Sequence, residues 1–527
     1  MEFLNYPAAK KLTVLAKTPF DLRQLTPDRI SKYYGEACGF KLLFGTERVT
    51  DEVMKTLKEL ADEAHALDKI KKMQAGEVLN FIEKYPSENR EVLHTATRDF
   101  FDHPNEAKAA KDAAAVAKNE TEKLKLFISK IDSEKKFTNL IMIGIGGSDL
   151  GPQANYFAMQ HLQKTGRKIF FISNVDPDDA AHVLREADLS HCLVVVVSKS
   201  GKTLETAVNE EFARTKFKAK GLNPKDHFVS ITTPKSPMDN PKNYLESFYV
   251  WDWIGGRYST TSMVGGVMLA FAFGFEVFWE FLRGANAMDK AALKDNLNDN
   301  IPLLAALLGI WNRNFCNYPT VALIPYSQAL KRYPAHIQQV AMESNGKLID
   351  QHGHFVKFET GPVFWGEPGT NAQHSFFQLI HQGTSTIPVS MVGFKESQYK
   401  DDLSYGETTS QEKLLSNLFA QSIALATGQE SENPNTYFPG NRPTNILLGE
   451  RLTPYAVGAL LSFYENMIAF QGFIWGINSF DQEGVQLGKV LATKIINRFA
   501  AKKQKTDNKT NYPIGDAFIQ HLDKFNK

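Results

Sequence analysis

The sequence predicts an α/β protein with two doubly wound domains, mainly parallel sheets and a helical C-terminal arm. Apolar runs recur roughly every 30 residues between positions 105 and 275, with helical periodicity between them. These runs are Leu140 to Ile145, Ile169 to Ile172, Leu193 to Val197 and Phe228 to Ile231. Strands that are apolar throughout, alternating with amphipathic helices, are typical of a parallel sheet covered on both faces.

A second pattern of the same kind follows. Its expected strands are Val321 to Ile324, Ile387 to Val392 and Ile446 to Leu448, and its helices include Ser410 to Ala426 and Tyr455 to Ile477. We therefore divide the chain into an N-terminal segment, 1–104, that contributes to the larger domain, a small domain, 105–275, a large domain, 276–481, and an arm, 482–527. The arm should hold a helix, Val485 to Ala500, a polar link, Lys502 to Lys509, and a terminal amphipathic segment.

The composition excludes several classes of partner. The 527 residues include 60 Lys and Arg against 59 Asp and Glu, a formal net charge of +1, so we expect neither nucleic acid nor an anionic membrane as a partner. The most apolar stretch, Gly265 to Leu282, contains Glu276 and Glu280, which predicts one buried helix rather than a membrane span.

Cysteine usage and the N-terminus predict a cytoplasmic protein. Cys38, Cys192 and Cys316 are too few and too widely spaced for a disulfide framework or a metal knuckle. The first residues contain charges at Glu2 and Lys10 and no apolar run of secretory length, so we expect no signal peptide.

Two loops after expected strands could bind an anion. Gly144 to Gly151 reads GIGGSDLG and opens a helix, where backbone N–H groups favour an anion, although a purely structural turn fits as well. It is not a dinucleotide fingerprint, because Asp149 stands at the sixth position. Ser198 to Thr206 reads SKSGKTLET; it lacks the first glycine of a P-loop, and its hydroxyls suit a phosphate ester held without metal. Both loops should lie at the same edge of the sheet.

Four longer segments carry a resemblance to a known family. The segments are Trp253 to Ser262, Met342 to Lys347, Gly366 to His374 and Gly484 to Lys489. Together they resemble the phosphoglucose isomerase family. The resemblance runs in the family's order from Val92-Leu-His94 to Lys489 and covers most of the chain. The resemblance implies two sugar-isomerase (SIS-like) domains and reversible isomerisation of D-glucose 6-phosphate to D-fructose 6-phosphate through a cis-enediolate, without metal or organic cofactor.

The resemblance also implies the catalytic residues. From pattern alone, Glu343 would be a solvated carboxylate at a helix end, Arg257 a structural ion pair, His374 a packing or capping residue and Lys489 a solvated lysine. The family assigns proton transfer to Glu343, stabilisation of the enediolate to Arg257, and ring opening to His374 and Lys489. It further implies a homodimer in which His374 crosses the interface.

Substrate-binding residues follow from the same resemblance. Gln339 and Glu343 lie four residues apart and should share a helix face. The residues expected to bind the sugar and its phosphate are Gly147, Ser148, Ser198, Lys199, Ser200, Thr203, Gln339 and Gln482.

The chain departs from the common family pattern at a few positions. The phosphate loop has Ser200-Gly201-Lys202 where many members have Thr-Phe-Thr, which predicts a more flexible loop and a possible contact of Lys202 with phosphate. Glu483 replaces a common Trp, and Thr97 an apolar residue. Neither change removes a catalytic group.

Several alternatives remain open from the sequence. His352 and His354 could share one face of a strand as a metal pair, but no cysteine or close carboxylate completes a ligand set. An isomerase that also accepts mannose 6-phosphate, a sugar-phosphate-binding regulator on the same fold, and a secreted second role are the rival functions. The joint presence of Glu343, Arg257, His374 and Lys489 argues against the regulator.

Overall fold

The computed structural model of the chain describes residues 2–504 and 512–526, and it divides into two units, Met1–Ser479 and Phe480–Lys527. Both sheets predicted from the sequence belong to the first unit, and the helical arm corresponds to the second. Most of the expected polar link, Lys502 to Lys509, lies outside the described residues. The borders predicted at 105 and 276 stay predictions.

The first sheet is entirely parallel, and its strands have the order β6-β5-β7-β8-β9. The four predicted strands are present. Helices cover both faces of the sheet, so β5, β7 and β8 are buried throughout, whereas β6 is only partly buried. An edge strand was not predicted, since its sequence is short and of mixed polarity. The strands are β5 (Asn139–Ile143), β6 (Lys168–Ile172), β7 (Cys192–Val197), β8 (Phe228–Thr232) and the edge strand β9 (Glu246–Tyr249).

The second sheet has the order β1-β2-β15-β12-β10-β11. Its last four strands run parallel, while β2 pairs antiparallel with β15 and brings an N-terminal hairpin into the sheet. The strands are β1 (Tyr34–Ala37), β2 (Phe40–Leu43), β10 (Thr320–Pro325), β11 (Val363–Trp365), β12 (Val389–Phe394) and β15 (Thr444–Gly449). Two short hairpins pair β3 (Val78–Asn80) with β4 (Arg90–Glu91) and β13 (Ser404–Tyr405) with β14 (Thr408–Thr409). The predicted mixed α/β class with mainly parallel sheets is confirmed.

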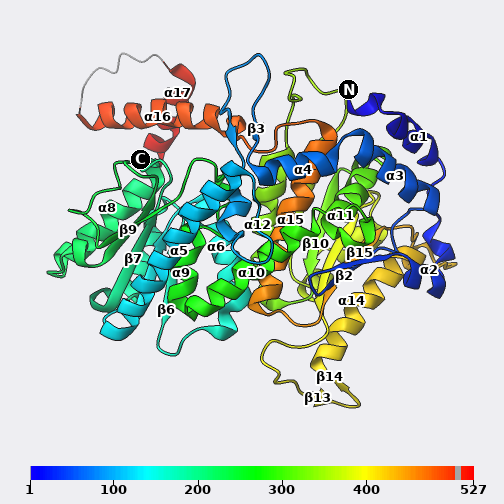
Figure 1. Cartoon of the computed structure of the whole chain (residues 1–527), viewed down its shortest axis with the longest axis horizontal. Helices are drawn as coiled ribbons and strands as arrows, with labels where there is room; N and C mark the ends of the chain where they lie inside the picture. The colour runs from blue at the N-terminus through cyan, green and yellow to red at the C-terminus, as the bar shows by residue number, and fades with distance from the viewer. Residues whose placement is uncertain (1, 505–511, 527) are drawn as a thin grey trace. The chain divides into compact units, whose positions relative to one another are not determined.

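Helices surround both sheets, and α15, in which residues 457–475 are all buried, packs against α10 and α11 (Figure 1). The helices of the first unit are α1 (Pro7–Leu15), α2 (Pro27–Lys32), α3 (Asp51–Glu63), α4 (Ala66–Ala75), α5 (Lys108–Glu134), α6 (Leu150–Met159), α7 (Pro177–Glu186), α8 (Leu204–Ala219), α9 (Met263–Phe273), α10 (Phe275–Ala291), α11 (Ile301–Ile310), α12 (Tyr333–Gln338), α13 (Phe377–Gln382), α14 (Ser410–Thr427) and α15 (Pro454–Trp475). The second unit contains α16 (Gln486–Gln504) and α17 (Pro513–Asp523).

The apolar stretch Gly265 to Leu282 forms two helices, so the prediction of one continuous helix is wrong. The break falls at Gly274, whose φ of +101° is a conformation that residues with a side chain rarely adopt. Every residue of α9 is buried, whereas Glu276 in the first turn of α10 is exposed. Among the described residues, no helix has the length and hydrophobicity needed to cross a membrane.

A buried carboxylate joins the N-terminal segment to the second sheet. Glu47 is fully buried and accepts hydrogen bonds from Asn312 Nδ2 at 3.0 Å and Asn445 Nδ2 at 2.9 Å. Burial disfavours the charged form, which raises the pKa of Glu47 from 4.5 to about 7. Between these two pH values the folded chain holds a proton that the unfolded chain has lost, so this group makes the folded state less stable as pH rises.

The Glu47→Gln variant should therefore show a flatter pH dependence of stability. A shift in pKa from 4.5 to about 7 lowers the free energy of unfolding by about 3 kcal/mol as pH rises through that range. Glutamine does not titrate, so the variant lacks this decrease. Urea unfolding of wild type and variant in steps between about pH 4.5 and 8 measures this, with Glu52→Gln on an exposed carboxylate as the control. Equal slopes in wild type and Glu47→Gln would show that Glu47 does not titrate in this way.

Candidate active site

The glycine-rich turn after β5 contacts the segment that carries Arg257. Gly146–Ser148 forms a short 3₁₀ turn before α6, and Gly146 has a φ of +59°. A Cβ on Gly147 would lie 2.2 Å from the carbonyl carbon and oxygen of Gly256 and 2.7 Å from the backbone nitrogen of Arg257. Only glycine fits at this approach, which explains why the turn needs Gly147 and why these two distant segments can meet.

The hydroxyl-rich loop follows β7, the strand next to β5, at the same edge of the sheet. The Ser198 hydroxyl donates to Thr203 Oγ1 at 3.0 Å, and Ser200 Oγ accepts from the Lys202 backbone N–H at 3.2 Å. The Lys199 ammonium donates to the carbonyl oxygen of Ile254 at 3.1 Å, and burial lowers its pKa. Hydrogen bonds among its own hydroxyl and backbone groups thus stabilise the loop, and Lys199 connects it to the segment before Arg257.

Arg257 is buried, and three contacts hold its guanidinium in one orientation. Its Nε donates to Ser344 Oγ at 2.7 Å, its Nη2 donates to the Ser479 carbonyl oxygen at 2.7 Å, and its Nη1 lies 3.4 Å from Glu343 Oε2. The Tyr258 hydroxyl is 2.8 Å from the same Ser344 Oγ. A planar, permanently charged group fixed in this way is suited to a position where negative charge must be stabilised.

Glu343 lies at the end of a π-helical turn, Gln339–Glu343, that continues α12. Such turns are rare and occur often at functional sites. The Glu343 side chain is 24% exposed, whereas its partner Arg257 is 1% exposed. The carboxylate therefore has a cation beside it and remains accessible to a small molecule.

Gln339 reaches the glycine turn from the other end of the same π-helical segment. Its Nε2 lies 3.3 Å from the place that a Cβ on Gly146 would take, and its buried Oε1 has no hydrogen-bond partner within the described part of the chain. An amide oxygen left in this way is available to a ligand. The structure thus brings together Gly147, Arg257, Gln339 and Glu343, and the roles that the family resemblance implies for them stay predictions.

Asp149, which follows the glycine turn, has its side chain buried. Burial raises the pKa of Asp149 to about 6, opposed by the nearby Arg332 cation and by a hydrogen bond with Ser173. The carboxyl therefore takes up a proton at a higher pH than an exposed aspartate would.

The structure places His374 in the first unit, and Gln482 and Lys489 in the second. His374 ends a 3₁₀ turn, Asn371–His374, and is exposed; among the described residues, no hydrogen bond or ion pair connects it to Glu343 or Arg257. Lys489 is exposed on the first turn of α16, and Gln482 precedes that helix. Because both belong to the second unit, their approach to the cluster stays a prediction.

The two histidines considered as a metal pair have carboxylate partners instead. His352 Nδ1 lies 2.8 Å from Glu83 Oε2, and His354 Nδ1 lies 3.5 Å from Asp350 Oδ2. In the part of the chain that the structure describes, no group of three or more His, Cys, Asp and Glu side chains could hold a metal ion.

Sequence reasoning missed the residues that orient Arg257. Ser344 directly follows Glu343, so its position in the sequence alone could have indicated that it lies near the site. Ser479 gave no signal, because its role as a partner through a backbone carbonyl is visible only in three dimensions. Tyr258 lies in the segment Trp253 to Ser262, but its contact with Ser344 could not be predicted from the sequence.

The fold and this cluster define a class of α/β proteins in which an accessible carboxylate lies beside a fixed cation at the carboxyl edge of a parallel sheet, an arrangement suited to proton transfer. The family described as Phosphoglucose isomerase matches residues 44–512. The glucose-6-phosphate isomerase of Protochlamydia amoebophila is 66% identical over 525 residues, 99% of this chain and 98% of the relative. The chain belongs to the phosphoglucose isomerase family, and the resemblance read from its motifs is confirmed.

Other relatives agree with this assignment. The glucose-6-phosphate isomerase of Chlamydia pneumoniae is 52% identical over 497 residues, 94% of each chain. The crystal structure of a glucose-6-phosphate isomerase from Chlamydia trachomatis D/UW-3/Cx superposes with a TM-score of 0.95 at 48% identity and covers 100% of both chains.

Proposed function

We propose that this protein is a cytoplasmic enzyme that interconverts D-glucose 6-phosphate and D-fructose 6-phosphate. The observation that carries the proposal is the pair of Glu343 and Arg257, 3.4 Å apart, next to the glycine turn at Gly147. Moving a hydrogen between C2 and C1 of a sugar requires a base for the proton and a cation for the enediolate that forms. This pair supplies both from side chains, so the proposed chemistry needs neither metal nor organic cofactor.

The phosphate of the substrate should bind at the two loops after β5 and β7. The Gly147 backbone N–H and the Ser148 hydroxyl precede α6, and the hydroxyls of Ser198, Ser200 and Thr203 precede α8. Helix N-termini and hydroxyl donors at one sheet edge favour a phosphate ester. Lys199 contributes by its charge and by fixing the loop to Ile254.

Proton transfer follows from the geometry at the π-helical turn. With the phosphate at the loops, the sugar chain extends toward Gln339 and Glu343. The Glu343 carboxylate takes the C2 proton and returns it to C1, while the hydroxyl proton passes from O2 to O1. The Arg257 guanidinium stabilises the oxygen that becomes negative in between. Because Ser344 and Ser479 already orient Arg257, little reorganisation is needed during the reaction.

Ring opening is assigned to His374 and Lys489, with Gln482 holding the sugar. Since His374 is exposed and has no described link to Glu343, we place it in the site of the partner subunit of a homodimer. The C-terminal arm would then carry Lys489 to the site near the ring oxygen.

The direct test is a coupled assay with chelator-treated protein. Fructose 6-phosphate is offered as substrate, and glucose 6-phosphate is read out through a dehydrogenase. Turnover without metal supports the proposal, and its absence in correctly folded protein would contradict it. Mannose 6-phosphate in the same assay measures how specific the enzyme is at C2.

Mixed dimers test the position of His374. We expect a dimer of one Glu343→Gln and one His374→Ala protomer, purified through two different tags, to have about half of wild-type activity, because one of its two sites then contains both native residues. The matched control is a dimer of Glu343→Gln with wild type, which defines the activity of one site. Activity no higher than that of the parent variants would place His374 in the site of its own protomer.

A further inference from the structure

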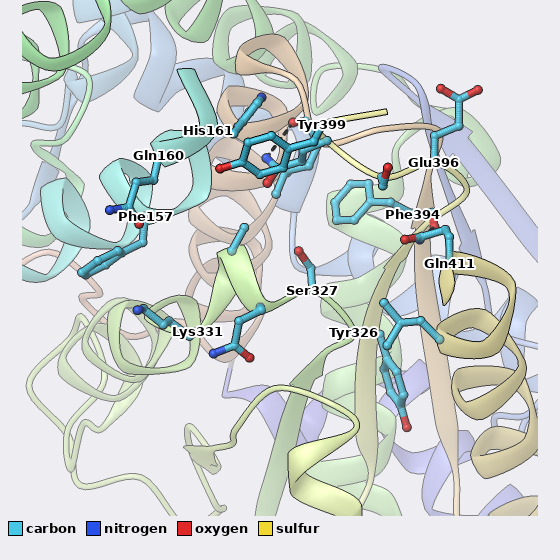
Figure 2. A pocket seen from close by; sticks show the side chains of 16 residues that line it. Phe157, Gln160, His161, Tyr326, Ser327, Lys331, Phe394, Glu396, Tyr399 and Gln411 are labelled. Carbon is cyan, nitrogen blue, oxygen red and sulfur yellow. Dashed lines mark hydrogen bonds between the residues drawn. The ribbon is translucent and has the colours of Figure 1, made fainter. Parts of the chain in front are cut away.

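A second cavity lies at the carboxyl edge of the second sheet, away from the glycine turn. It has a volume of about 350 Å³, within the range of roughly 300–1,000 Å³ that is usual for small-molecule pockets. Figure 2 shows Ser327 at its centre, with Phe157 and Lys331 on one side and Phe394 on the other. None of its lining residues belongs to the site described above.

The cavity lies in the second sheet at a position equivalent to that of the loops after β5 and β7 in the first sheet. In the first sheet, the chain leaves β5 for β6 on one side and then crosses to β7 on the other, and the two anion-binding loops follow β5 and β7. In the second sheet, it leaves β10 for β11 on one side and then crosses to β12 on the other. Tyr326 and Ser327 follow β10, and Glu396 to Tyr399 follow β12. Ligands of doubly wound sheets bind at such reversals of strand order.

The cavity does not have the features of a phosphate site. Where the first sheet has a glycine turn, the second has Tyr326 and Ser327. The N–H groups of Ser410 and Gln411, which begin α14 at one wall, donate to the Asp402 carboxylate at 3.0 and 3.1 Å. Because a carboxylate already occupies this helix start, it would repel a second anion.

The charged side chains at the cavity also have partners, which favours a neutral ligand. Lys331 Nζ lies 4.2 Å from the centre of the Phe157 ring, and Glu396 pairs with Arg451 Nη1 at 3.4 Å. Tyr326 accepts a hydrogen bond from Gln373 and points away from the centre (Figure 2).

The other lining groups combine aromatic faces with hydrogen-bonding side chains. Phe157, Phe394 and Tyr399 offer apolar rings, while Ser327 and Gln160 offer a hydroxyl and an amide. The Nδ1 atom of His161 is buried and has no hydrogen-bond partner among the described residues. A sugar ring has an apolar face of C–H groups and a rim of hydroxyls, which matches such a lining.

We propose that this cavity is a second binding site, separate from the isomerase site, for an unphosphorylated sugar or a similar neutral polyol. The sugar ring packs among Phe157, Phe394 and Tyr399, and its hydroxyls bond to Ser327 and His161. The proposal does not depend on the activity of the first site.

The test uses methyl β-D-glucopyranoside, which lacks a phosphate and cannot be isomerised, in saturation-transfer-difference NMR. We expect signal transfer at sugar concentrations on the order of 1–10 mM, unchanged when D-glucitol 6-phosphate saturates the isomerase site. Loss of the signal with D-glucitol 6-phosphate would place the sugar in the isomerase site and overturn the proposal. Displacement by inorganic phosphate would overturn the neutral character of the ligand.

Variants locate the binding. Phe157→Ala, which removes the ring, and Ser327→Phe, which fills the centre, should each lower the transferred signal at least fivefold, while the isomerase rate without the sugar stays unchanged and shows that the fold is intact. If Ser327→Phe does not fold, Ser327→Ala replaces it. The control is Phe212→Ala, which removes another partly buried ring, on α8. Equal signals in wild type, Phe157→Ala and the Ser327 variant would overturn the assignment to this cavity.

Discussion

Replacing Glu343 by glutamine is expected to lower kcat by a factor on the order of 10² to 10⁴, the usual contribution of a positioned general base. The amide has nearly the same shape as the carboxylate and can still lie next to the Arg257 guanidinium, but it cannot accept the C2 proton. The loops after β5 and β7 are unchanged, so the affinity for sugar phosphate should fall far less than the rate.

Initial rates in both directions, together with calorimetric binding of D-glucitol 6-phosphate, measure this difference. Hydrogen exchange at C2 of the substrate with solvent gives a second readout, and it should decrease in parallel with turnover. The control is Glu359→Gln, which removes an exposed carboxylate that also pairs with an arginine, Arg313. A Glu343→Gln enzyme with near wild-type kcat would show that another group is the base.

The sequence was sufficient to predict the central strands, because strands buried on both faces consist mostly of apolar residues. All residues of β7 are buried, and the run Leu193 to Val197 is apolar throughout. The edge strands β9 and β11 escaped prediction, because β9 is short and of mixed polarity and β11 has only three residues. The break at Gly274 was also missed, because the apolar pattern continues across it.

For the site, local motifs identified the residues, but not how they meet. The sequence pattern allowed either an anion-binding or a purely structural turn at Gly147, and the family resemblance supplied the roles expected of Arg257 and Glu343. That a Cβ at Gly147 would collide with Gly256 is a property of two segments folded against each other. The orientation of Arg257 by Ser344 and Ser479 likewise depends on packing between distant parts of the chain, which no local pattern records.

Arg257→Lys is expected to lower kcat by about 10² to 10³, which is the typical effect of losing one donor aimed at a developing negative charge. Lysine keeps the positive charge, but it has a single nitrogen in place of a planar group with three. It cannot donate to Ser344 Oγ and the Ser479 carbonyl oxygen while also facing Glu343, so the cation moves away from the reacting oxygen.

The size of this effect separates orientation from charge. If net charge alone mattered, Arg257→Lys would retain most of its activity, whereas Arg257→Gln would lose it. If orientation matters as the contacts indicate, both variants lose activity, and Ser344→Ala, which removes the acceptor for Nε, shows a smaller loss in kcat with little change in KM. Arg214→Lys is the matched control, because Arg214 also forms a largely buried pair, with Glu210, but on α8. Arg257→Lys with wild-type kcat would show that the fixed guanidinium plane is not needed for enediolate stabilisation.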